Sequence, residues 1–218
     1  MRAALALLTF FFVARAAAGG FESGSDSVLT LYDRAGNAIS IANQFDGATH
    51  SVEIDSTNRQ RGFNWSRSHS DGYAERYNTA VLDASGNIYL AGMRLFQNRK
   101  YLWAAKYRND GYLLWEQADT VPDCLAMSAF ATENGELWMA GSCLGNGNPV
   151  RVLRYAAAGH LVWGQSYLAE GRSLVRGLSV DFADRVSITL ETSGFGYGGG
   201  SSARTVVFDR NGGRIALF

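Results

Sequence analysis

Short apolar runs separated by polar turns make up most of the chain. Several of these runs are almost continuously apolar, which is typical of strands that are buried on both faces: "IYLAGM" (88–93), "YLWAAKY" (101–107) and "LWMAGS" (137–142). No stretch keeps a helical period. The best candidate, "SYLAEGRSLVRGL" (166–178), is interrupted by Gly171. The pattern therefore predicts an all-β chain.

Three features recur at one period of about 49 residues. Turn glycines occur at Gly36, Gly86 and Gly135, separated by 50 and 49 residues. Tryptophans that close a later strand recur at nearly the same spacing, at positions 65, 115 and 163, separated by 50 and 48 residues. A second set of turns places an aromatic residue four positions before a glycine, in "YRNDGYLLW" (107–115), "YAAAGHLVW" (155–163) and "FDRNGGRIA" (208–216). A shared period of this length indicates a repeat architecture.

Each unit contains two hairpins, in which an aspartate or asparagine caps the turn and glycine adopts the positive φ. Four strands in about 48 residues match one blade of a β-propeller. Counting from Val28 gives four units, at about 28–77, 78–125, 126–173 and 174–218. The first unit has a second possible register, because "YDRAGNAI" is similar to "FDRNGGRI"; the 50-residue register is preferred because it also places Trp65.

The repeat resembles a known family. The pattern Asp-x-x-Gly-Asn-Ile-Tyr-x-Ala-Gly, a Lys-Tyr strand and then Asp-Gly-x-x-x-Trp, within residues 78–165, is similar to the β-propeller repeats of secreted bacterial proteins, often described as seven-bladed propeller repeats. The resemblance implies an all-β propeller of about four four-stranded antiparallel blades, and it says little about activity. Four units predict either a closed four-bladed ring or an open, incomplete propeller that pairs with another chain.

The N-terminus predicts export. Residues 1–18 combine Arg2, an apolar run of 12 residues, and small residues at Ala16 and Ala18, as in a cleaved signal peptide. An uncleaved anchor is the alternative, although a span needs about 20 apolar residues. We expect a short linker over 19–27, a propeller domain over 28–218, a periplasmic or extracellular location, and no membrane association after signal cleavage.

Charge argues against nucleic acid as a partner. The chain has 20 Lys+Arg and 20 Asp+Glu residues. Loss of Arg2 and Arg15 with the signal leaves 18 against 20, a net charge near −2. Nucleic acid binding requires a concentrated basic surface, which this balance does not favour.

Cys124 and Cys143 lie nearly equidistant from the turn "TENG", on opposite strands of one predicted hairpin. In an oxidising compartment they are expected to form a disulfide; two buried free thiols are the alternative. The three histidines, His50, His69 and His160, fall in different units without ligand spacing. We therefore expect no metal and no cofactor.

Catalytic motifs are weak. There is no Gly-x-Ser-x-Gly elbow, and Asp33, Asp83 and Asp110 are explained by turns. The glycine-rich "GFGYGGG" (194–200) is followed by a predicted strand rather than a helix, so we interpret it as an inter-strand loop and not a phosphate site.

Rim loops are the best binding candidates, because they vary on a fixed frame. Two of them combine arginine with aromatic residues, "SRSHSDGYAERY" (66–77) and "MRLFQNRK" (93–100). The candidate binding residues are Arg67, His69, Tyr73, Arg94, Phe96, Arg99 and Lys100.

These residues favour a secreted, non-enzymatic recognition or scaffold module that binds a protein or glycan. The alternatives are a polysaccharide hydrolase or lyase with an axial carboxylate pair about 5 to 10 Å apart, and an incomplete propeller that functions only as an oligomer.

Overall fold

The protein is an all-β propeller made of four four-stranded antiparallel sheets. The computed structural model describes residues 28–45, 50–58, 62–70, 73–145, 148–168, 172–193 and 201–218. Within these ranges there is no helix, and so none that is long and apolar enough to cross a membrane. The predicted fold class is confirmed. The predicted signal (1–18), linker (19–27) and glycine-rich loop (194–200) lie outside the described residues.

The strands of each sheet lie side by side in chain order. Blade 1 contains β1 (Leu29–Tyr32), β2 (Ala38–Phe45), β3 (His50–Asn58) and β4 (Gly62–His69). Blade 2 contains β5 (Ala74–Leu82), β6 (Ile88–Phe96), β7 (Arg99–Tyr107) and β8 (Leu113–Pro122). Blade 3 contains β9 (Cys124–Ala131), β10 (Leu137–Cys143), β11 (Val150–Tyr155) and β12 (Leu161–Tyr167). Blade 4 contains β13 (Arg172–Val180), β14 (Val186–Ser193), β15 (Ser201–Phe208) and β16 (Arg214–Leu217).

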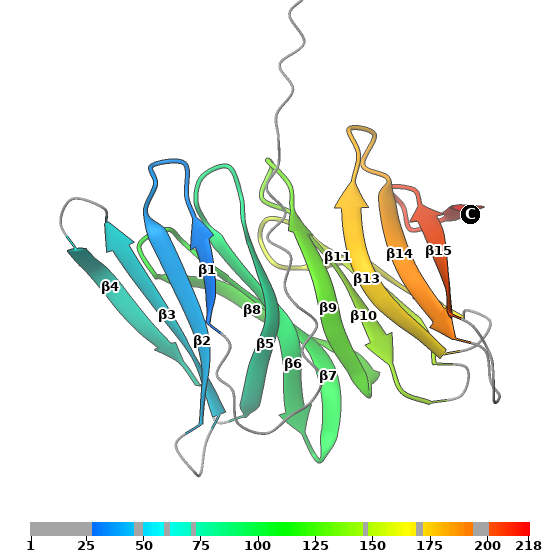
Figure 1. Ribbon diagram of the computed structural model, residues 1–218, viewed down its shortest axis with the longest axis horizontal. Coiled ribbons are helices and arrows are strands. Elements are labelled where there is room, and N and C mark those ends of the chain that lie inside the picture. The colour runs from blue at the N-terminus through cyan, green and yellow to red at the C-terminus, as the bar shows by residue number, and fades with distance from the viewer. Residues whose placement is uncertain are drawn as a thin grey trace, which may run out of the picture.

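The blades form an open arc. Figure 1 shows the four sheets in a row, with blade 1 (blue) at one end and blade 4 (orange to red) at the other. The first strand of each later blade packs on the blade before it: β5 contacts β1 and β3, β9 contacts β5 to β7, and β13 contacts β9 to β11. Of the two predicted arrangements, the structure therefore has the incomplete propeller rather than the closed ring.

Three hydrophobic cores fill the seams between neighbouring blades, and the two middle blades contribute to two cores each. Ile88 and Tyr89 are adjacent in β6 and both fully buried. Because side chains alternate along a strand, Ile88 packs in the seam with blade 1 and Tyr89 in the seam with blade 3. Leu137 and Trp138 divide in the same way between the two seams of blade 3. This double burial explains the continuous apolar runs of the middle units.

The outer face of blade 1 is polar. Ser40 stands four residues after Gly36, at the position that Leu90 occupies in blade 2 and Met139 in blade 3. It is paired across the strands with Asp55, and neither residue is buried. Ile39 and Ile41, which flank Ser40, are buried toward blade 2.

The outer face of blade 4 is polar as well. Ser187, Thr189 and Glu191 alternate with Val186, Ile188 and Leu190, which are buried toward blade 3. Thr189 is exposed and is paired with Thr205. The outer faces of blades 1 and 4 are therefore both hydrophilic.

A tryptophan–glycine contact joins each pair of neighbouring blades and accounts for two of the sequence repeats. The indole N–H of Trp115 in blade 2 donates to the carbonyl of Ala157 in blade 3, at 3.0 Å. Gly159 lies directly against the ring, and a Cβ at this position would come within 2.6 Å of Trp115 Cγ. The same contact is made by Trp65 with Gly111 and by Trp163 with Gly212.

The first hairpin turn of blade 2 is built as the sequence predicts, with an aspartate that caps the turn and a later glycine that adopts a positive φ. The Asp83 carboxylate accepts hydrogen bonds from the backbone N–H groups of Ser85 and Asn87, at 2.9 and 3.0 Å. In blade 4 the corresponding turn has no glycine, and Asp184 takes the left-handed conformation instead, with a φ of 55°. The acidic residues of these turns are therefore used to shape the hairpins.

Candidate functional site

A groove of about 360 Å³ lies at one end of blade 2. It is formed by the end of β6, the start of β7, the end of β8 and the residue that precedes β5. The lining residues are Tyr73, Arg94, Phe96, Tyr101, Ala118, Asp119 and Thr120. Three of the seven are aromatic, and their rings offer flat apolar surface to the groove.

The aromatic residues are held by packing against each other and against arginine. Tyr73 and Phe96 meet edge to face, with ring centroids 5.6 Å apart. Their side chains remain 40% and 42% exposed. The Arg94 guanidinium lies over the Tyr73 ring, 4.9 Å from its centroid. Tyr101 is paired with Arg94 across β6 and β7, which places both side chains on one face of the sheet. The groove is therefore a preformed surface.

A buried ionic cluster lies beside the groove, in the seam between blades 1 and 2. Arg94 Nε donates to Glu75 Oε1 at 2.7 Å, and the same guanidinium also contacts Glu116. His69, the last residue of β4, places Nε2 at 3.5 Å from Glu116 Oε2 and 3.9 Å from Glu75 Oε2. Glu75 has no exposed surface. Three strands of blade 2 and one of blade 1 thus meet in a single polar centre.

Aromatic side chains orient this cluster. The Tyr107 hydroxyl lies 2.5 Å from His69 Nδ1. The indole N–H of Trp103 donates to Glu116 Oε1 at 2.9 Å. Donor atoms of His69, Glu75 and Glu116 lie within 4.8 Å of one another, so these are the described residues that could hold a metal ion.

The two glutamates do not form an open carboxylate pair. Both contact the Arg94 guanidinium, and Glu75 is shielded from solvent. Glycoside cleavage requires two carboxyl groups that face the scissile bond from opposite sides. Glu75 and Glu116 therefore do not present such a pair to a substrate.

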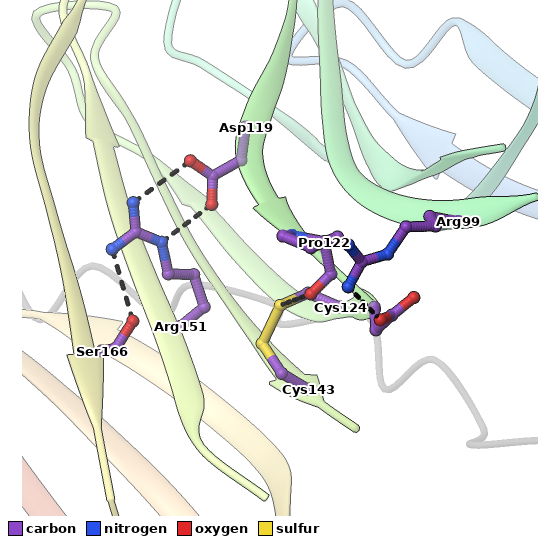
Figure 2. The surroundings of a disulfide bond; sticks show 8 residues. Arg99, Asp119, Pro122, Cys124, Cys143, Arg151 and Ser166 are labelled. Carbon is purple, nitrogen blue, oxygen red and sulfur yellow. Dashed lines mark hydrogen bonds and ion pairs between the residues drawn. A yellow bond between two sulfur atoms is a disulfide. The ribbon is translucent and has the colours of Figure 1, made fainter. Parts of the chain in front are cut away.

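Asp119, on the opposite wall of the groove, is also paired. Its carboxylate accepts hydrogen bonds from Arg151 Nε at 2.8 Å and from Arg151 Nη2 at 3.1 Å, across the seam to blade 3 (Figure 2). Both residues are buried. The charges that border the groove are therefore compensated by buried partners.

Figure 2 also shows the disulfide between Cys124 and Cys143, near this ion pair. The two cysteines lie directly opposite each other on β9 and β10. The predicted disulfide is confirmed.

The structure brings together four of the seven predicted binding residues and separates the other three. Tyr73, Arg94 and Phe96 line the groove, and His69 lies in the buried cluster beside it. The remaining three are placed elsewhere. Arg67 donates to the Gly111 carbonyl in the seam of blades 1 and 2, Arg99 pairs with Asp123 at 2.7 Å, and Lys100 lies at the β6–β7 hairpin.

The predicted binding residues do not include Tyr101, Glu75, Glu116 or Asp119. Tyr101 belongs to the run "YLWAAKY", whose apolar pattern indicates only a buried strand. Its position two residues before Trp103 is a usable signal, because it puts both rings on the same face. The glutamates carry no such signal, since Glu75 and Glu116 are 41 residues apart.

No family model and no curated protein matches the chain. Among solved structures, it is similar to the β-propeller domain of the trilobed protease from Pyrococcus furiosus, described as having an open velcro topology, with a TM-score of 0.52 and 9% identity over 86% of this chain and 56% of that one. A tail fiber of Staphylococcus aureus phage P68 also matches, with a TM-score of 0.33 and 9% identity over 88% of this chain and 51% of that one. The chain thus spans about half the length of these two. The first similarity and the four sheets define the class of this protein as a β-propeller.

Proposed function

We propose that this protein is a secreted recognition module that binds an uncharged glycan in the groove of blade 2. The observation that carries the proposal is the convergence of Tyr73, Phe96 and Tyr101 on one groove. Ligand sites are mostly apolar and aromatic hollows of about 300 to 1,000 Å³ with a few polar groups, and the groove fits this description.

Charge compensation favours a neutral ligand. Arg94 is bound to Glu75 and Glu116, and Asp119 is bound to Arg151. An anionic or cationic ligand would have to compete with these buried pairs. A sugar ring offers an apolar face for stacking on an aromatic ring and hydroxyl groups for the polar rim, which suits the groove better than a charged peptide does.

Secretion is supported by the disulfide and by the N-terminal sequence. Disulfides persist in oxidising compartments such as the periplasm and the cell exterior. Cys124 and Cys143 form such a bond. A periplasmic or extracellular module would also encounter polysaccharide.

The proposal is tested with a glycan array followed by calorimetry on the best binder. Phe96→Ala and Tyr101→Ala should each weaken binding at least about tenfold, because each removes a stacking surface. Tyr112→Ala is the matched control, since Tyr112 is 62% exposed and lies outside the groove lining. The proposal would be refuted if no glycan bound, or if all three variants lost the same affinity. Binding of an unglycosylated protein in the same groove would indicate the protein-binding alternative.

A further inference from the structure

We infer that His69, Glu75 and Glu116 form a zinc site that connects blade 1 to blade 2. The inference does not depend on glycan binding. It starts from three metal-binding side chains that come from β4, β5 and β8 and that converge in one seam. The sequence-based expectation of no metal rests on histidine and cysteine spacing alone, which gives no weight to glutamates brought together by the fold.

The donor atoms are close to a coordination geometry. His69 Nε2 is 3.5 Å from Glu116 Oε2 and 3.9 Å from Glu75 Oε2. Zinc binds nitrogen and carboxylate oxygen at about 2.0 to 2.2 Å, so neighbouring tetrahedral ligand atoms lie about 3.3 to 3.5 Å apart. All three donor atoms lie within 4.8 Å of one another, so side-chain shifts of up to about 1 to 1.5 Å would bring them to one ion.

The other polar atoms of these ligands are already bound by neighbouring groups. His69 Nδ1 contacts the Tyr107 hydroxyl, and Oε1 of each glutamate contacts Arg94. Trp103 adds a second donor to Glu116 Oε1. His69 Nε2 faces Oε2 of both glutamates. Outer contacts of this kind orient metal ligands and are part of functional metal centres.

The donor set selects the ion. One imidazole and two carboxylates suit zinc, and three protein ligands leave a fourth position for water. Before His69 is counted, the two carboxylates and the one guanidinium give the cluster a net charge of −1. A divalent cation changes this net charge to +1. Water bound to zinc can lose a proton and restore neutrality. Such an ion would tie the last strand of blade 1 to blade 2.

The test measures metal binding by the full-length mature protein without a histidine tag. After treatment with a chelator and dialysis, Zn²⁺ should bind at one equivalent per chain and raise Tm with increasing concentration. Co²⁺ should give the visible absorption bands of a low-coordinate site rather than those of the hexaaquo ion. Glu116→Gln and His69→Gln should weaken binding at least about tenfold.

His160→Gln is the matched control, because His160 is exposed on an outer turn of blade 3. It should bind zinc as the wild type does. If His69→Gln fails to fold, Glu116→Gln and the wild-type cobalt spectrum still decide the matter. No stoichiometric binding, or an equal loss in the control, would overturn the inference and leave the cluster as a histidine–arginine–glutamate network. Glycan affinity measured on the metal-free protein separates this result from the proposed function.

Discussion

Trp115 occupies the space that a side chain on Gly159 would need. The ring of this tryptophan in blade 2 lies so close to the turn of blade 3 that a Cβ on Gly159 would approach Cγ to 2.6 Å, and Gly159 also has a φ of +90°. The sequence repeats of tryptophan and turn glycine are the two halves of this contact. Blade stacking, and not hairpin geometry alone, therefore requires glycine here.

Gly159→Ala should lower the free energy of unfolding by about 3 kcal/mol. Positive φ costs a non-glycine residue about 1 to 2 kcal/mol, and overpacking costs about 1 to 3 kcal/mol. Gly36→Ala provides the control, since its φ is +80° but a Cβ at this position would have no atom within 4 Å. It should lose only about 1 kcal/mol. Urea denaturation measures both, and equal losses would contradict the steric role of Trp115.

Local and periodic features of the fold could be predicted from sequence, because each repeat carries its own turn, strand and seam residues. Four sheets and the disulfide follow from such features. The openness of the arc has a sequence signal as well, in the apolar–polar alternation of "ISI" (39–41) and "VSITLE" (186–191) in the end blades, which marks one solvated face on each. The ionic cluster could not be predicted, because cross-strand register and blade packing decide which distant residues meet.

The polar end faces predict a monomer. Substitution of the cross-strand pair by leucine, Ser40→Leu with Asp55→Leu, should create an apolar end face like those inside the arc. Exposed apolar sheet faces associate, so the double variant should self-associate in sedimentation velocity while the wild type sediments as a single chain. Glu133→Leu with Asn134→Leu adds the same two leucines at an exposed turn of blade 3 and should remain monomeric. A dimeric wild type would favour the predicted oligomeric propeller instead.

The disulfide should contribute about 3 kcal/mol, as expected for a loop of about 20 residues. Replacing both cysteines by alanine, Cys124→Ala with Cys143→Ala, should lower the urea midpoint without adding a buried hydroxyl, since both sites are buried. Thiol titration of the unfolded wild type should give no free thiol before reduction and two after it. An equal count in both states would disprove the bond.

Alkaline pH should destabilise the seam between blades 2 and 3. Burial raises the pKa of Tyr89 and Tyr155 well above the ordinary value of 10, with Asp83 and Asp119 adding to the effect. Above about pH 10 an unfolded tyrosine loses its proton while these two keep theirs, so the unfolded state binds fewer protons and stability falls.

Lys106 has the opposite effect on the free energy of unfolding, and this effect occurs at lower pH. Burial lowers its pKa, so its contribution to the free energy of unfolding rises as pH increases toward the unfolded value of about 10.5. Urea midpoints between pH 8 and 11.5, combined with absorbance at 295 nm, separate the two effects. Tyr89→Phe should flatten the alkaline decline, although it loses the contact of the hydroxyl with the Gly135 carbonyl at 2.7 Å and starts from a lower stability. An unchanged slope in this variant would mean that Tyr89 does not govern the alkaline limit of the seam.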